Sequence, residues 1–108
     1  MNKNPALVKH ILDAIKTINE YIAKRTFDDF CNNQIIVDAV VFQFMIIGEA
    51  STKLSNSFHE KHSDIPFHQI IGLRNKIVHA YWIIDTKVIW DAYKNDLPEL
   101  KKKLLKAI

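Results

Sequence analysis

The apolar segment IIVDAVVFQFMII, residues 35–47, constrains the fold more than any other part of the chain. It lies in a stretch, residues 33–56, that we expect to form one long helix. At about 100° per residue, five residues of this stretch share one face: Ile36, Val40, Ile47, Ala50 and Leu54. Three more apolar residues fall on the other side: Val41, Phe42 and Met45. A helix that is apolar on two sides needs two covers, so we expect the core on one side and a second copy of the chain on the other.

Two acidic residues of the same stretch, Asp38 and Glu49, flank Phe42 and Met45 on the outer side. Charged residues around an apolar centre are typical of a dimer interface, and they also suit a site that receives a cation. We therefore expect Asp38 and Glu49 either to form the rim of an interface or to pair with a cationic side chain.

The composition favours one all-helical domain over residues 1–108. Hydrophobic residues make up 48% of the 108 residues, and only two glycines and three prolines interrupt the helix-forming ones. We expect a bundle of four to five helices in up-and-down order, paired as a homodimer. The expected helices cover residues 5–24 after an Asn4 cap, 33–56, 66–82 and 87–95, with a short helix or turn at 26–31. Pro98 is expected to break or kink the helix at 87–95, and Asp96 with Glu99 can cap a last helix after it.

Charge and cysteine content narrow the class of protein further. The net charge of +3 permits an acidic partner such as RNA without requiring one. Cys31 is the single cysteine, so an intrachain disulfide is excluded and a reducing cytoplasm fits best. The first residues, MNKNPALVKH, lack the apolar core of a signal peptide. The apolar run 35–47 is too short to span a bilayer and contains Asp38 and Gln43, so we expect a soluble protein without membrane contact.

The segment RNKIVHAYW, residues 74–82, places charged and polar side chains inside an expected helix. On a helical wheel Arg74 lies in the middle of the apolar stripe, and His79 lies about 140° around the helix, on the side of Asn75. An unpaired buried charge is costly, so the Arg74 guanidinium must bind a carboxylate, a carbonyl oxygen or a phosphate.

Two interpretations of Arg74 stay open on spacing alone. In the first, Arg74 forms a structural ion pair with Asp38 or Glu49. In the second, two copies of the chain meet about a twofold axis, and each brings an Arg74 and a His79 into a shared cleft. Histidine can move protons near neutral pH, and arginine can bind a phosphate and stabilise its negative charge. Such a cleft suits cleavage of an RNA phosphodiester bond without a metal or another cofactor.

The stretch Arg74 to Tyr81, R-N-K-I-V-H-A-Y, resembles the R-x4-H-x-Y signature of HEPN-domain proteins. The nearest likeness is to the HepT-like group of prokaryotic toxin–antitoxin ribonucleases. Three longer segments also resemble recurring segments of that group: IIGEASTKLS at 46–55, IPFHQIIGLRNKIVHAYW at 65–82 and DTKVIWDAYKNDLPEL at 85–100. The resemblance therefore extends over most of the chain.

The resemblance implies a homodimeric helical bundle with a composite, metal-independent site for RNA cleavage at the dimer interface. In such a site Arg74 would bind and stabilise the scissile phosphate, His79 would act as general acid or base, and Asn75 would orient the site. The resemblance also implies a partner, an MntA-like nucleotidyltransferase antitoxin that inhibits the toxin by transferring AMP to Tyr81.

Two other functions fit the same sequence. The chain can be a noncatalytic helical subunit that binds a minimal nucleotidyltransferase, with Arg74 held in an internal ion pair. It can also be a structural dimer in which the motif serves packing alone. RNA cleavage by the purified protein separates the first hypothesis from these two.

Several further residues suggest chemistry that we consider less favoured. His59 and His62 in HEKH are three residues apart rather than the four of a zinc-protease motif, so we expect solvated histidines at a helix end. Trp82, Trp90 and Tyr93 can stack on bases, but packing in the core or an interface is the more common use of aromatic residues at helical spacing.

Two glycines, Gly48 and Gly72, lie inside expected helices. Glycine weakens a helix relative to alanine, so its presence there usually has a packing reason. We expect each of the two to permit the close approach of another helix.

Overall fold

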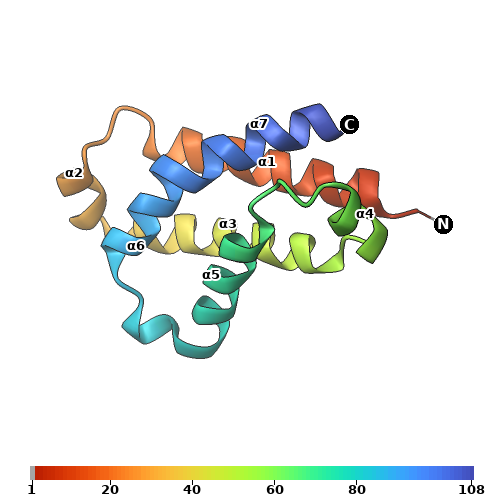
Figure 1. Ribbon diagram of the computed structural model, residues 1–108. Helices are drawn as coiled ribbons and strands as arrows, with labels where there is room; N and C mark the ends of the chain where they lie inside the picture. Colours follow the sequence, from red (N-terminus) through yellow and green to blue (C-terminus); the bar gives the residue numbers. More distant parts are fainter. Residues whose placement is uncertain (1) are drawn as a thin grey trace.

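The computed structural model describes residues 2–108, except for the side chain of Tyr81. These residues form helices and connecting segments without any strand (Figure 1). The α-helices are α1 (Asn4–Ile22), α2 (Phe27–Cys31), α3 (Gln34–Lys53), α4 (Asn56–Lys61), α5 (Phe67–Ala80), α6 (Thr86–Asp91) and α7 (Leu97–Ala107). A short 3-10 helix, η1 (Tyr81–Ile83), follows α5, and a π-helix, η2 (Ala92–Asp96), joins α6 to α7. The expected all-helical class is confirmed for the described residues.

Helix α3 lies at the centre of the molecule and packs against α1 on one side and α5 on another. Figure 1 shows α1 running alongside α3 and α7 slanting over α1, whereas α5 runs across α3, so the up-and-down order does not extend to α5. The core is one cluster to which α1, α3 and α7 contribute most of the fully buried side chains: Ile11, Ile15, Ile18, Ile22, Phe44, Ile47, Leu97, Leu100 and Leu104. This arrangement holds the first part of α5 firmly and leaves its last turn at the edge of the body.

The two apolar sides of α3 have different environments. The predicted inner stripe is buried at Val40, Ile47, Ala50 and Leu54 and half-buried at Ile36. On the outer side Val41 and Met45 are half-buried, but Phe42 keeps 54% of its surface exposed. Helix α5 of the same chain therefore provides part of the second cover, and an exposed apolar area around Phe42 remains.

By length and composition alone, α3 could cross a membrane, and within residues 2–108 it is the one helix that could. The sequence prediction considered only the run at 35–47, but the helix that contains this run has 20 residues. Its position between α1 and α5 gives a sufficient reason for its apolar composition, because a central core helix is apolar on more than one face.

The start of the first helix and the end of the central helix differ from the predicted positions, and one short helix was not predicted. Helix α1 starts at Asn4 rather than after it, because the Asn4 side chain bonds to Ser55 instead of capping: its Nδ2 donates to the Ser55 Oγ at 3.0 Å. Helix α3 ends at Lys53, and the polar segment after it contains the unpredicted helix α4, which the Ser55 side chain caps. The short helix or turn expected at 26–31 is confirmed as α2, and Thr26 and Asp29 form a capping box at its start.

Of the two effects expected of Pro98, a break or a kink, the break is wrong, because the chain stays helical from Thr86 to Ala107. Proline inside an α-helix loses one hydrogen bond and collides with the carbonyl group four residues before it. The π-helix η2 widens the turn at this point, and the Leu97 N–H donates to the Ala92 carbonyl oxygen, five residues back. Asp96 lies within this continuous helix and makes no capping bond, so its predicted role as a cap is also wrong.

We predict that Asp96→Asn stabilises the protein at neutral pH. Burial, and next the negative charge of Asp91, raise the pKa of the Asp96 carboxyl. The ionised carboxylate therefore costs stability above the folded-state pKa, and this cost disappears as the pH falls through that pKa. Because Asp96 is only partly buried, we expect Tm to rise by about 1–3 °C at pH 7. Below about pH 3 the gain should vanish, because Asp96 is then protonated in both states.

Asp13→Asn is the matched control with the opposite sign. A hydrogen bond from Lys9 lowers the pKa of the fully exposed Asp13, so its ionised form adds stability at neutral pH that is lost as the pH falls through the folded-state pKa. Thermal unfolding of both variants by circular dichroism, at the two pH values, measures the difference. A Tm change in Asp96→Asn that is the same at pH 7 and below pH 3 would contradict the prediction.

Candidate active site on helices α3 and α5

The crossing of α3 and α5 depends on Gly48. A Cβ atom built on Gly48 would overlap the Cβ of Arg74 and lie 2.6 Å from its Cγ. The stem of the Arg74 side chain therefore lies directly on the backbone of α3, and the prediction that Gly48 permits a close helix approach is confirmed. The same prediction for Gly72 is wrong, because a Cβ there would have no atom within 4 Å and Gly72 is exposed.

Arg74 is bonded on two sides. Its Nε and Nη2 donate to Oε2 of Glu49 at 2.9 and 2.6 Å, and its Nη1 donates to Oδ1 of Asn75 at 2.8 Å. A guanidinium carries five N–H donors, so two of them have no bond to the described residues. The Arg74 side chain is 24% exposed, so a ligand from solvent can reach part of it.

The two acidic residues that sequence analysis considered have different environments. Glu49 faces Arg74 and also lies 4.0 Å from the Nζ of Lys53, one turn further along α3. Asp38 accepts a bond from the Gln34 side chain at 2.7 Å and lies eleven residues before Glu49, or about 16 Å along the helix. The sequence analysis missed Lys53, although its four-residue spacing from Glu49 was a usable signal.

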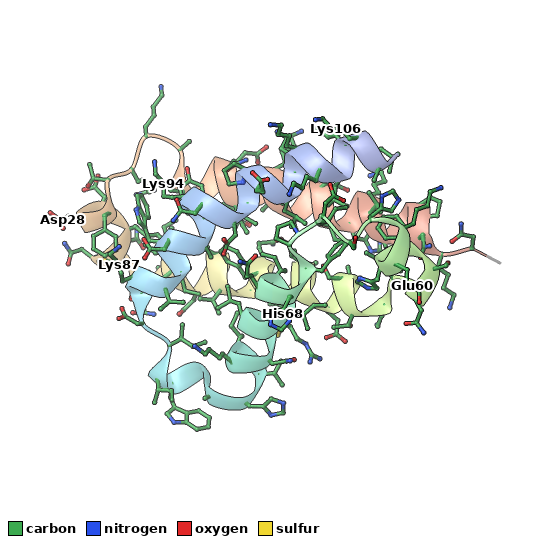
Figure 2. The ribbon with its side chains drawn as sticks, in the orientation of Figure 1. Asp28, Glu60, His68, Lys87, Lys94 and Lys106 are labelled. Carbon is green, nitrogen blue, oxygen red and sulfur yellow. The ribbon has the colours of Figure 1, made fainter. Side chains whose placement is uncertain are left out.

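His79 lies exposed in the last turn of α5 and, among the described residues, bonds to none. It lies five positions after Arg74, so the two side chains leave the helix in different directions. Figure 1 shows that this end of α5, with η1 after it, projects away from α1, α3 and α7, and Figure 2 shows side chains of this segment directed outward. One chain therefore supplies the accessible imidazole of His79 and the guanidinium of Arg74, which Glu49 and Asn75 hold in place. No bond between these two groups is found in the described residues. The side chain of Tyr81 lies outside the described residues.

The two histidines of the HEKH segment, His59 and His62, have structural roles in the described part of the chain. His59 is half-buried, shares a hydrogen bond of 3.0 Å with the Ser51 carbonyl oxygen, and packs on Phe67. His62 packs on Phe58. No group of three or more His, Cys, Asp or Glu side chains that could hold a metal is found within these residues.

The two tryptophans differ in environment. Trp90 packs against three aromatic rings, those of Phe27, Phe30 and Tyr93, so packing is confirmed as its role. Trp82, in η1, keeps 70% of its surface exposed.

The sequence of this chain matches a family model described as "Ribonuclease HepT-like" over residues 11–107. The chain therefore belongs to the HepT-like ribonuclease family, as the R-x4-H-x-Y segment predicted. A comparison with solved structures gave no match.

Curated relatives agree with this assignment. "Probable ribonuclease HepT" of Thermococcus cleftensis is 36% identical over 92% of this chain and 90% of its own length. "Putative RNase MJ1380" of Methanocaldococcus jannaschii is 35% identical over 92% of this chain and 91% of its own length. "Gamma-glutamylcyclotransferase and putative RNase MJ0434" of the same organism is 36% identical over 92% of this chain, but the chain spans only 45% of that protein.

We predict that Gly48→Ala destabilises the domain although alanine is the better helix former. The new methyl group would collide with the Arg74 Cβ, which cannot move without its backbone, so α3 and α5 must separate. Overpacking of this kind typically costs about 1–3 kcal/mol. Urea unfolding measures the loss.

Gly72→Ala is the matched control, because it is the same substitution in a helix with open space around the new methyl group. We expect it to stabilise the domain by about 0.5–1 kcal/mol through helix propensity. Equal effects of the two substitutions would show that Gly48 does not set the approach of the helices.

Proposed function

We propose that this protein is a metal-independent endoribonuclease toxin of a prokaryotic type VII toxin–antitoxin system and that it acts as a cytoplasmic homodimer. Membership of the HepT-like ribonuclease family supports the substrate class. The observation that carries the proposal is the state of Arg74: its guanidinium is fixed by Glu49 and Asn75 at the protein surface, and two N–H donors remain for a phosphate.

In the proposed reaction, one imidazole takes the proton of a ribose 2′-hydroxyl while its oxygen attacks the adjacent phosphorus. The bond from phosphorus to the 5′-oxygen breaks, and a second imidazole gives a proton to that oxygen. The products are a 2′,3′-cyclic phosphate and a 5′-hydroxyl end. Arg74 binds the phosphate oxygens and stabilises the negative charge that grows in the transition state, while Asn75 keeps the guanidinium in place.

This chemistry favours two copies of the chain. Each chain contributes one exposed His79 from its R-x4-H-x-Y motif. The proposed reaction uses two imidazoles, one as the base and one as the acid. A hollow of about 460 Å³ lies on α1 and α3 next to Glu49, and apolar residues form most of its lining: Leu7, Phe42, Met45, Ile46 and Ala50. We propose that a second copy covers this hollow, with Glu49 at the rim of the interface.

The proposed regulation rests on the family resemblance. A nucleotidyltransferase antitoxin would transfer AMP to the hydroxyl of Tyr81, which follows His79 by two residues. An adenylate at this position would add a negatively charged phosphate close to the proposed cleft and repel the RNA backbone.

One observation favours the alternative of a noncatalytic subunit. Arg74 is already neutralised by Glu49 in the single chain, as a structural ion pair would be. In that case the chain would bind a minimal nucleotidyltransferase and would not cleave RNA.

We predict that the purified protein cleaves single-stranded RNA in the presence of EDTA. His79→Ala should lower the cleavage rate about 10²–10⁴-fold through loss of proton transfer, and Arg74→Ala about 10²–10³-fold through loss of charge stabilisation. Lys76→Ala, which removes an exposed cation from the same helix, should cleave at the normal rate. The readout is the rate of formation of 5′-hydroxyl ends.

The cleavage assay distinguishes the proposed nuclease from the noncatalytic subunit. Full cleavage by both Arg74→Ala and His79→Ala would refute their proposed roles. Absence of cleavage by the unmodified protein, together with stable binding to a nucleotidyltransferase, would establish the noncatalytic subunit instead.

We predict that Phe42→Asp disrupts the dimer and reduces cleavage. Phe42 is a large, exposed apolar side chain of the proposed contact, so a carboxylate there should raise the dissociation constant of the dimer about 30-fold or more. Leu105→Asp on α7 is the control, because Leu105 is similarly exposed at 51% but lies outside the proposed contact. Light scattering measures the mass, and a Phe42→Asp protein that stays dimeric would remove this surface from the interface.

A further inference from the structure

A separate hollow lies at the opposite end of α3 from Glu49. It has a volume of about 370 Å³, within the range of small-molecule sites. Its lining comes from the first two turns of α3, from η1 and the connecting segment after it, and from α6: Gln34, Val37, Asp38, Val41, Trp82, Ile84, Thr86 and Ile89. Figure 1 shows how the chain after α5 returns from the projecting end toward α6 and the start of α3.

The lining combines the groups that recognise a nucleobase. Trp82 provides an aromatic ring that is 70% exposed, and unpaired bases stack on such rings. Asp38, Gln34 and Thr86 add hydrogen-bonding groups around it. The lining includes a carboxylate and no Lys or Arg, so it would repel a phosphate and accept the uncharged part of a nucleotide.

The arrangement of Asp38 indicates which bases fit. Its Oδ1 accepts a bond from the Gln34 Nε2 at 2.7 Å, which fixes the carboxylate, and within the described residues no bond to Oδ2 is found. A carboxylate accepts N–H donors. Guanine presents two adjacent donors, the ring N1–H and the N2 amino group, whereas uracil presents a single one at N3. The hollow therefore favours guanine over uracil.

The hollow is also well placed relative to the proposed cleavage site. Trp82 follows His79 by three residues, about one helical turn, and Asp38 lies about 16 Å from Glu49 along α3. A short length of single-stranded RNA can therefore have a phosphate at Arg74 and a base at Trp82. A base in a duplex has its hydrogen-bonding edge occupied by its partner and cannot enter.

We propose that this hollow, formed by Trp82, Asp38 and Gln34, binds an unpaired guanine base of the same RNA strand, a few nucleotides away from the scissile phosphate. The inference rests on the proposed RNA-cleaving function for its substrate, and it gives that function a base preference and a restriction to single strands. The hollow is distinct from the apolar hollow that a second copy would cover, because the two share no lining residue.

The test measures RNA binding without cleavage. The His79→Ala protein, as a dimer, is titrated with fluorescent RNA pentamers that are either all uridine or uridine with one central guanosine. We expect the guanosine pentamer to bind about tenfold more tightly. Trp82→Ala in this background should weaken its binding roughly ten- to hundredfold through loss of stacking. Asp38→Asn should remove the preference for guanosine and leave the affinity for the all-uridine pentamer unchanged.

Two matched controls accompany these variants. Ile83→Ala removes a neighbouring side chain that is 72% exposed and does not line the hollow, and Asp13→Asn removes the same charge from α1. Neither should change binding by more than twofold. Equal effects of Trp82→Ala and Ile83→Ala, or a preference for guanosine that survives Asp38→Asn, would overturn the inference.

Two further results would also overturn the proposed guanine site. Loss of the dimer in Trp82→Ala without a change in base preference would assign the hollow to the second copy and overturn the inference, as would failure of both pentamers to bind. Failure of the proposed function is seen separately, as absence of cleavage by the protein with His79 intact, and guanosine-selective binding by the hollow would then still stand.

Discussion

The absence of a side chain at Gly48 is the constraint on which the arrangement of α3 and α5 depends. With any Cβ at this position, Arg74 and α3 would occupy the same space. The close approach places the Arg74 stem on the α3 backbone, and the guanidinium then reaches Glu49, the next residue after Gly48. This contact marks the point where α5 crosses α3, and the end of α5 that carries His79 projects beyond the crossing.

The ion pair of Arg74 and Glu49 suits a binding site better than a purely structural one. The two side chains keep 24% and 44% of their surface, so water screens their attraction and the pair adds modestly to stability. Its geometric effect is larger, because two bonds to one carboxylate oxygen fix the plane of the guanidinium. A phosphate that meets this plane would not have to reorganise it, which is how a fixed cation stabilises a transition state.

The sequence alone predicted those helices that form because of residues within their own segment. The first helix, the short helix at 26–31 and the apolar faces of α3 depend on residues within each segment, and the structure agrees with these expectations apart from their exact ends. The π-helix before Pro98 was missed because a proline can be accommodated by a break or by a wider turn, and packing decides between them. Helix α4 was missed because its polar residues resemble those of a loop.

The spacing of residues along one helix was not enough to identify the acidic partner of Arg74. Asp38 and Glu49 looked equivalent as partners for Arg74, since both lie on the outer side of α3. The choice between them depends on where α5 crosses, and that point is set by the fit of Arg74 over Gly48, a contact between residues 26 positions apart. Family membership was recognisable in advance because the ordered segments around Arg74 and His79 need no three-dimensional information.

For the proposed cleavage of RNA, the same geometry leaves one chain chemically incomplete. Arg74 and His79 are both accessible, but five helical positions direct them to different sides of α5, and no bond joins them in the described structure. A site that needs a fixed cation and two proton-transferring groups at one phosphate must then assemble from more than one α5 helix. In the proposed dimer the second copy covers the hollow on α1 and α3, and the projecting end of α5 keeps His79 exposed to solvent. The tight contact at Gly48 thus fixes the guanidinium within a chain, and the exposed last turn of α5 leaves the imidazole available for the proposed contact between chains.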